Sequence, residues 1–415
     1  MKEIARDTYL KKLIDRKGTS FIKIITGIRR CGKSYLLNPL FKNHLLESGV
    51  PEDHIIHINL EDDNHYELLQ PHKLTEYVKS KIVDDRQYYA LLDEIQLVPD
   101  FEAILNGFLH VENLDVYVTG SNSKFLSSDI ATEFRGRGDV IHMYPLSFAE
   151  YYSAVGRDKY EAWQQYYEYG GLPQILEQPD NEAKITFLKT QRDNVYLNDI
   201  IERYSIRKSE GFGALTEVLA SSIGSPTNPH KLERTFKSKV GVDLSYHKIE
   251  DYLEKLENAF LIEKSRRYDI KGKRYIDTPA KYYFSDMGIR NSFVDFRQTA
   301  ETHIMENVIY NELRRRGYQV DVGVVDTRKN NIRKQLEVDF IASRGDRTYY
   351  IQSAMSIGDL EKRAQESRSL DSINDHFSKI IIAKDAGLPG HERNGIITIN
   401  LFDFLFEENI LDKYQ

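Results

Sequence analysis

Cysteine is almost absent from this 415-residue chain: its single cysteine, Cys31, cannot form an intramolecular disulfide. Such scarcity favours a reducing compartment. No apolar run is long enough to span a bilayer, and charged residues occupy residues 1–18, where a signal peptide would need its apolar core. We therefore expect a cytoplasmic protein that has no membrane partner.

The chain also lacks an overall positive charge. Its formal net charge is −7, which excludes a globally basic nucleic-acid-binding protein, so any contact with nucleic acid has to come from a local patch. Low-complexity segments and obvious internal repeats are absent as well. The length is sufficient for two or three domains, each with its own core.

The most informative stretch is residues 21–37, FIKIITGIRRCGKSYLL. The apolar residues 21–25 predict a buried strand, and residues 34–47 predict a helix. Between them the chain matches the pattern G-x-x-x-x-G-K-[ST] at every position. Glycine-rich turns are common, but here the flanking strand and helix supply the context that a phosphate-binding loop requires.

The chemistry of a phosphate-binding loop explains this spacing. The two glycines allow backbone N–H groups to surround a phosphate, Lys33 can reach the β and γ phosphates, and the hydroxyl of Ser34 can ligate Mg²⁺. We interpret Cys31 as a filler residue of the loop. The predicted nucleotide-binding residues are Gly27, Ile28, Arg29, Arg30, Cys31, Gly32, Lys33, Ser34 and Tyr35.

A second pair of candidate residues follows the apolar segment at residues 87–98, QYYALLDEIQLV. Its aromatic and aliphatic residues predict a strand that ends in Asp93 and Glu94, similar to a Walker B element. Asp93 would hold magnesium through water, and Glu94 would orient and polarise the attacking water. An isolated Asp-Glu pair would be ordinary surface charge. Its position after a buried strand and downstream of a phosphate loop favours the catalytic interpretation.

Two further segments contain candidate catalytic residues. Residues 114–122 predict a strand whose polar tip places Ser121 or Asn122 where a γ-phosphate or attacking water would lie, unless this tip is simply a turn. Arg135 and Arg137 precede a short predicted strand, residues 140–143. We favour Arg137 as an arginine that completes the site of a neighbouring subunit, against a solvated or salt-bridged loop arginine.

These motifs together resemble a prokaryotic family of AAA-like ATPases that carry a C-terminal domain of unknown function. The matching segments are TGIRRCGKSYLL, ALLDEIQ, TGSNSKFLS, FRGRGDVIHMYPLSFAEY and YYEYGGLPQILE. The resemblance implies an ATP-dependent enzyme with a parallel sheet of strand order 5-1-4-3-2 and a helical lid. In AAA-type ATPases a polar sensor residue occupies the position of Ser121 or Asn122, and we favour Asn122. No clear second sensor arginine is present in the lid.

Residues 211–298 show the pattern of a winged helix, with helices followed by a strand, a basic turn and a strand. From residue 231 to residue 281 there are 13 Lys and Arg against 9 Asp and Glu, and several of the basic residues lie at the wing. The preceding helix also carries acidic residues that would repel phosphates, and winged helices dock proteins too. Both DNA and a protein therefore remain candidate partners of this module.

The last segment, residues 299–415, resembles a restriction-endonuclease-like α/β domain. Glu306 and Asp339 occupy the positions of two metal-binding acids in that fold. The third position reads Gln352-Ser353-Ala354, which lacks the expected acid and lysine. We interpret this domain as a degenerate nuclease fold that serves binding or assembly.

The sequence thus predicts an α/β protein with a P-loop AAA-type sheet and three further modules. The predicted parts are an ATPase core at 1–155, a helical lid at 156–210, a winged-helix module at 211–298 and the nuclease-like domain at 299–415. The expected cofactors are ATP and Mg²⁺, with the metal held by Ser34 and Asp93. The expected partners are DNA, a second copy of the chain or another protein. The alternatives are an ATP-gated metal-dependent nuclease and a nucleotide-binding signalling scaffold with little turnover.

Overall fold

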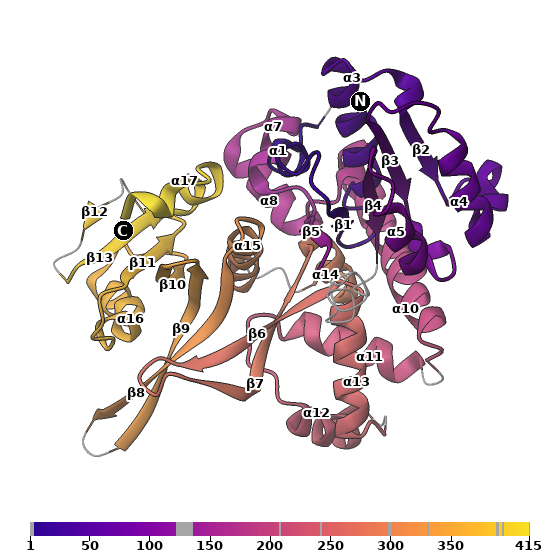
Figure 1. Ribbon diagram of the computed structural model, residues 1–415. Coiled ribbons are helices and arrows are strands. Elements are labelled where there is room, and N and C mark those ends of the chain that lie inside the picture. Colours follow the sequence, from indigo (N-terminus) through magenta and orange to yellow (C-terminus); the bar gives the residue numbers. More distant parts are fainter. Residues whose placement is uncertain are drawn as a thin grey trace. The chain divides into compact units, whose positions relative to one another are not determined.

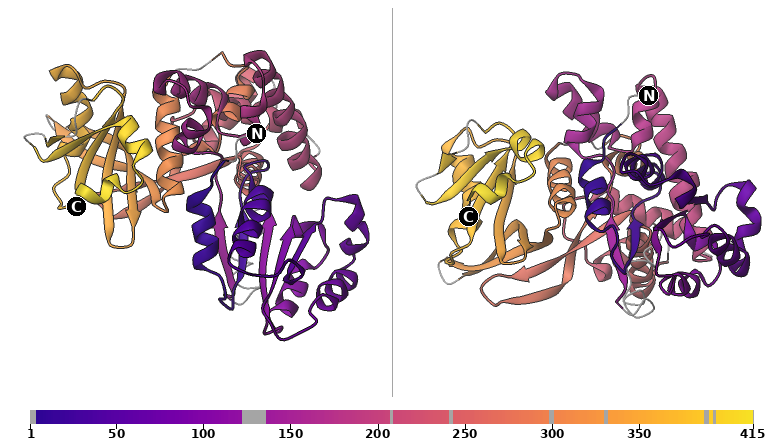
Figure 2. Two further views of the ribbon diagram at one scale, coloured as in Figure 1. Left: turned by 90° about the horizontal axis from the view of Figure 1, so that it is seen from above. Right: turned by 45° about the horizontal axis from the view of Figure 1, so that its top comes forward.

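The computed structural model describes residues 4–121, 136–206, 209–240, 243–297, 301–329, 332–386, 390–391 and 394–414. The chain forms two compact units (Figures 1 and 2). The first comprises Met1–Pro145, Leu172–Gln174 and Asn258–Phe260, and the second comprises Leu146–Gly171, Ile175–Glu257 and Leu261–Gln415. Among the described residues, no helix has the length and apolar character needed to cross a membrane.

The first unit is built on a parallel five-stranded sheet. Its strands are β1 (Ile22–Thr26), β2 (Ile55–Asn59), β3 (Tyr88–Asp93), β4 (Leu114–Gly120) and β5 (Gly138–His142). They lie in the order β2-β3-β4-β1-β5, and every neighbouring pair is parallel. The predicted order 5-1-4-3-2 is therefore confirmed.

Helices cover both faces of this sheet, as its continuous apolar strands require. On one face, α4 (Pro71–Ser80) and α5 (Phe101–Phe108) pack their buried apolar residues against alternate residues of β1 to β4. On the other face, Phe41 of the π-helical segment η1 (Leu36–Phe41) packs on Tyr117 of β4 with 4.5 Å between ring centroids. Helix α1 (Asp7–Asp15) contacts η1.

The helix predicted at residues 34–47 is not continuous. It consists of α2 (Lys33–Tyr35), η1 and α3 (Lys42–Glu47), and Asn38 has a non-helical backbone with φ −144° and ψ 115°. The reason is Pro39, which lacks an N–H donor and disfavours the helical conformation of the residue before it. The prediction of one uninterrupted helix was wrong at this point.

The second unit begins with helices that span the end of the predicted ATPase core and the predicted lid. They are α7 (Phe148–Val155), α8 (Lys159–Tyr169), η6 (Pro173–Glu177), α9 (Asn181–Thr190), η7 (Gln191–Leu197) and α10 (Asn198–Arg203). The next helices are α11 (Ser209–Ser221), α12 (Pro229–Thr235), η8 (Phe236–Val240), α13 (Tyr246–Asn258) and α14 (Met287–Phe293).

An eight-stranded mixed sheet forms the rest of this unit. Its strands are β6 (Ile262–Asp269), β7 (Arg274–Phe284), β8 (Gln319–Lys329), β9 (Ile332–Arg344), β10 (Arg347–Ala354), β11 (Ser378–Ala383), β12 (Gly390–His391) and β13 (Ile396–Asn400). The remaining helices are α15 (Glu301–Arg315), α16 (Leu360–Asp371), α17 (Leu401–Phe406) and η9 (Ile410–Tyr414).

The order of this sheet, β12-β13-β11-β10-β9-β8-β6-β7, connects two segments that the sequence analysis separates. Strands β6 and β7 correspond to the two strands predicted for the wing and pair antiparallel. Strand β6 also pairs in parallel with β8, matching Arg267 to Val322 and Asp269 to Val324. One sheet therefore runs across the predicted boundary at residue 298. The division into four domains, the winged helix and the nuclease-like fold stay predictions.

Candidate nucleotide site

The backbone of the loop between β1 and α2 includes positive φ angles, which glycine adopts without steric cost. Gly27 has φ +145°, and a Cβ atom there would lie 2.1 Å from the carbonyl oxygen of Met143. Gly32 has φ +102°, and Arg30 also has a positive φ, 64°. A side chain at position 27 would displace the neighbouring backbone, so glycine is required there for a steric reason as well as a conformational one.

Lys33 lies beneath this loop and is buried. Its ammonium donates to the carbonyl oxygens of Gly27 at 3.1 Å and Ile28 at 3.3 Å, and it lies 3.9 Å from Oε1 of Glu94. The positive charge is thus placed at the carboxyl ends of β1 and β3, where ligands of parallel sheets bind. This arrangement fits the predicted role of Lys33 as a phosphate ligand.

Ser34 and Asp93, the two predicted metal ligands, are brought together. The hydroxyl of Ser34 donates to the carboxylate of Asp93, which ends β3 and is buried. Burial raises the pKa of Asp93, while the hydrogen bonds from Thr119 and Ser34 oppose this rise. A hydroxyl and a carboxylate are oxygen donors of the kind that Mg²⁺ prefers, so these residues fit the ion.

Glu94 follows directly in the left-handed conformation, with φ 54°, which turns its side chain away from the direction of the strand. Its Oε2 accepts hydrogen bonds from the hydroxyl of Ser121 at 3.2 Å and from the amide of Gln96. The carboxylate is therefore held beside Lys33 by Ser121, which directly follows β4, and by Gln96, which lies in the turn after β3. A carboxylate fixed in this way can orient a water molecule.

Thr119 organises both acids and is absent from the predicted site. Its hydroxyl donates to Oδ1 of Asp93 and accepts the backbone N–H of Glu94 at 2.9 Å. One side chain of β4 thus fixes the neighbouring acids at the end of β3. Its position two residues before Ser121, near the carboxyl end of a central strand, was a signal that could have identified it.

Glu61, just beyond β2, is a third carboxyl group in this region that the sequence analysis did not assign. Burial raises its pKa, as do the negative charges of Glu94 and Asp93, whereas Arg29 and Lys33 lower it. Glu61 and Asp62, which end the apolar segment at residues 54–62, were the available signal. Glu61 therefore belongs to the electrostatic environment of the site.

The remaining predicted loop residues have different positions. Nε of Arg29 lies 3.5 Å from the hydroxyl oxygen of Ser121, whereas Arg30 and Tyr35 are exposed. Cys31 is fully buried, and burial raises the pKa of its thiol against the opposing charges of Lys33 and Arg6. A thiol in this environment is a poor nucleophile, which agrees with its interpretation as a filler residue.

Arg137 lies at the amino ends of the parallel strands, opposite to the end that carries the phosphate loop. Its carbonyl oxygen accepts the N–H of Ile22 at 2.9 Å, and Ile22 is in register with Gly138, so Arg137 precedes the amino end of β5. Strand β1 has five residues, which separate this end from the phosphate loop by roughly 15 Å. The exposed Arg137 is therefore not part of the nucleotide site of its own chain. Asn122 and Arg135 lie outside the described residues.

The acidic residues predicted in the nuclease-like domain do come together, around a lysine that the sequence analysis placed elsewhere. Nζ of Lys281, on β7, lies 2.9 Å from Glu306 and 2.8 Å from Glu337. Tyr283 also donates to Glu306, at 2.7 Å. Burial would lower the pKa of Lys281, but the carboxylates of Glu306, Asp339 and Glu337 raise it.

Asp339 accepts two 2.8 Å hydrogen bonds, from the backbone N–H and the hydroxyl of Ser353. Burial raises its pKa to about 7, and the nearby charge of Glu306 adds to this effect. No group of three or more His, Cys, Asp or Glu side chains within the described ranges has an arrangement that could hold a metal ion. Lys281 is a single cation shared by Glu306 and Glu337, so it balances only one of these two charges. The group that these carboxylates contact is a lysine, which agrees with the poor fit of the described residues to a nuclease metal site.

Comparison with known families agrees with the geometry of the first unit. Residues 19–152 match the model of an AAA domain, and residues 160–300 match a domain of unknown function. The structure of the Orc1 protein of Aeropyrum pernix in complex with DNA is matched with a TM-score of 0.30 at 12% identity, covering 71% of this chain and 93% of that chain. A score at this level supports no inference about function.

Two relatives match along almost their whole length. An uncharacterized protein of Haemophilus influenzae is 34% identical over 410 residues, which cover 97% of this chain and 99% of the relative. The uncharacterized protein MJ1544 of Methanocaldococcus jannaschii is 29% identical over 406 residues, covering 93% of this chain and 86% of the relative. The chain therefore belongs to the family of the H. influenzae protein, and its amino-terminal part is an AAA domain with a P-loop ATPase fold.

Proposed function

We propose that this protein is a magnesium-dependent ATPase whose nucleotide state controls its engagement with DNA or with a DNA-associated protein. One observation supports the hydrolytic part most directly. Thr119 holds Asp93 beside Ser34 and orients Glu94 beside Lys33, so residues from three separate segments form one constellation. The family resemblance favours ATP as the nucleotide.

In this mechanism Lys33 and the N–H groups of the loop bind the phosphates of ATP. Ser34 and Asp93 hold Mg²⁺, which when bound neutralises phosphate charge. Glu94 orients the attacking water, with its carboxylate positioned by Ser121 and Gln96. Arg137 of a neighbouring subunit completes the site, which requires self-association in the cytoplasm.

The test is steady-state phosphate release by wild type and by Glu94→Gln, measured across protein concentration with and without duplex DNA. We expect Glu94→Gln to bind ATP but to lose at least about a hundredfold in turnover. Glu67→Gln, which changes an exposed glutamate, is the matched control and should behave as wild type. Tight ATP binding without turnover in the wild type would instead favour a nucleotide-binding scaffold.

The basic hairpin between β6 and β7 is the part of the second unit that we propose for DNA contact. Lys271, Lys273 and Arg274 are exposed there. By contrast, Lys248 and Lys255 of α13 both form ion pairs with Asp251 of the same helix. In the hairpin, Arg274 lies 3.8 Å from a carboxylate oxygen of Asp269, and Lys271 donates to the backbone carbonyl of Asp326 at 3.1 Å. The shorter ion pairs of α13 leave its charges less available to phosphates than those of the hairpin.

We expect Lys271→Gln, Lys273→Gln and Arg274→Gln together to weaken duplex binding for all sequences. The slope of log affinity against log salt should fall by roughly 0.9 for each phosphate that the variant no longer neutralises. The double variant Lys248→Gln with Lys255→Gln, which removes positive charge from α13, is the control for a general loss of charge. Equal binding by the hairpin variant and the wild type would favour protein docking instead of DNA contact.

A further inference from the structure

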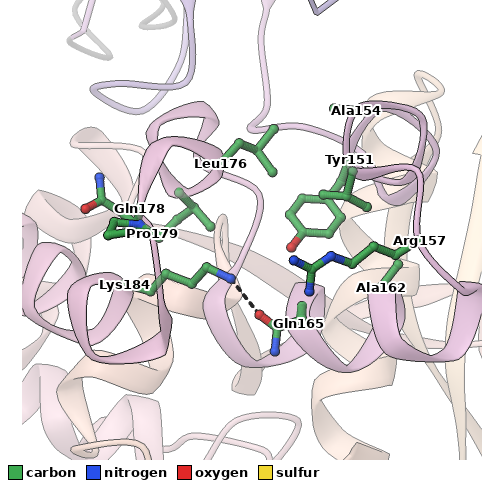
Figure 3. A pocket seen from close by; sticks show the side chains of 11 residues that line it. Tyr151, Ala154, Arg157, Ala162, Gln165, Leu176, Gln178, Pro179 and Lys184 are labelled. Carbon is green, nitrogen blue, oxygen red and sulfur yellow. Dashed lines mark hydrogen bonds between the residues drawn. The ribbon is translucent and has the colours of Figure 1, made fainter. Parts of the chain in front are cut away.

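A separate cavity lies among the helices of the second unit (Figure 3). It has a volume of about 280 Å³, close to the lower end of small-molecule sites, and is lined by α7, the loop after it, α8, η6 and α9. Its apolar wall includes Val155, Ile175 and Leu176. The charged side chains that line it are Arg157 and Lys184, and the described lining contains no carboxylate.

The two cations approach the cavity from different elements. Figure 3 shows Arg157, from the loop between α7 and α8, and Lys184, from α9, extending toward each other across it. Burial lowers the pKa of Lys184 and the positive charge of Arg157 lowers it further, against the smaller opposing effects of Glu168 and Asp180. Arg157 is exposed and Lys184 is half-buried, so solvent screens part of the repulsion between these two like charges, and a bound anion would reduce it further.

Some polar groups around the cavity make no hydrogen bond within the part of the chain that the structure describes. Lys184 donates to Oε1 of Gln165 at 2.6 Å. Arg157 makes no hydrogen bond or ion pair with any residue that the structure describes. Tyr151 is 2% exposed and lines the cavity, and its hydroxyl likewise has no hydrogen-bonding partner among the described residues. Its oxygen keeps some solvent contact, so water or a ligand in the cavity can form the hydrogen bond.

We propose that this cavity binds a phosphate monoester with a small apolar carbon part. The phosphate carries between one and a half and two negative charges near neutral pH, about the charge of the two facing cations. Arg157 would form a paired hydrogen bond to its oxygens, Lys184 would act as a point charge, and Tyr151 would donate its free hydroxyl hydrogen. The apolar wall would contact the carbon part.

The experiment is calorimetric titration of the full-length protein at low ionic strength with phenyl phosphate, benzenesulfonate and phenol. These probes share one ring and carry two, one and no negative charges. We expect saturable binding that is tightest for phenyl phosphate and lost for phenol. Equal binding of all three, or no binding of phenyl phosphate at millimolar concentration, would overturn the proposal.

Single substitutions distinguish binding in this cavity from binding at the phosphate loop. Arg157→Gln and Lys184→Gln should each weaken phenyl phosphate binding at least about tenfold. Tyr151→Phe, which keeps the ring and removes only the hydroxyl, should weaken it about threefold or more. Lys189→Gln, on the same helix but outside the lining, should bind as wild type, and thermal unfolding of every variant checks the fold.

The decisive comparison uses Lys33→Ala, which disables the phosphate loop. Binding that persists in Lys33→Ala and is weakened in Arg157→Gln supports the cavity as the site. Binding that is lost in Lys33→Ala and unchanged in Arg157→Gln would show that the probe occupies the phosphate loop, and would overturn the proposal.

Discussion

The ammonium of Lys33 lies 3.9 Å from a carboxylate oxygen of Glu94, and both residues are buried. The cation proposed to bind phosphate and the carboxylate proposed to orient water are therefore electrostatically coupled before any chemistry takes place. Substitutions at these two positions should not have additive effects, because removing one charge leaves the other uncompensated.

We expect this coupling to be measurable in the stability of the protein. A double-mutant cycle with Lys33→Ala and Glu94→Gln should give an interaction of about 0.5–3 kcal/mol in the free energy of unfolding, determined by urea titration. The same cycle between Lys33 and the distant, exposed Glu67 is the control. Additive effects of Lys33→Ala and Glu94→Gln would argue against the ion pair.

The second prediction concerns Thr119. Thr119→Val keeps the shape of the side chain but removes the hydroxyl that bonds Asp93 and the N–H of Glu94. We expect ATP turnover to fall by at least about tenfold, because two acids lose their orientation while Lys33 stays in place. Thr119→Ser keeps the hydroxyl and should retain most of the activity. Wild-type turnover in Thr119→Val would remove Thr119 from the site.

The third prediction concerns Lys281 in the carboxylate cluster. Lys281→Met leaves Glu306 and Glu337 without their shared cation, which we expect to destabilise the protein by about 3–5 kcal/mol. Lys264→Met, which changes an exposed lysine of the adjacent strand, is the matched control for loss of charge. The double variant Lys281→Met with Glu306→Gln should recover part of the stability that Lys281→Met loses. No recovery would mean that packing, not charge, causes the loss.

The fourth prediction follows from the raised pKa of Asp339, about 7 in the folded protein against an ordinary value of 3.8. Between these values the folded state holds a proton that the unfolded state has released. The contribution of Asp339 to stability is thus complete below about pH 4 and is lost as the pH rises to about 7. The slope of this loss is at most about 1.4 kcal/mol per pH unit.

Asp339→Asn should remove this dependence, so the stability difference between wild type and variant should change from pH 4 to pH 7 and stay constant above it. Chemical denaturation across this range is the measurement. Asp346→Asn, which changes an exposed aspartate, should give a constant difference. A constant difference for Asp339→Asn as well would contradict the shifted pKa.

The local sequence pattern was sufficient to predict the part of the fold that contains the candidate nucleotide site. The strand order of the first sheet and the meeting of Ser34 with Asp93 agree with prediction, because strand, loop and strand-end acids are each recognisable within a few residues. The uninterrupted helix after the loop was predicted wrongly, since its apolar periodicity was weighed above the effect of Pro39.

The sequence by itself determined which residues form the phosphate-loop motif, since those residues are consecutive and the glycine backbone dictates their geometry. Only the tertiary structure decided that Thr119 holds both acids, that Lys281 lies among the carboxylates near Asp339 and that β6 pairs with β8. These contacts join segments far apart in the chain. They depend on sheet register and burial, which no local pattern encodes.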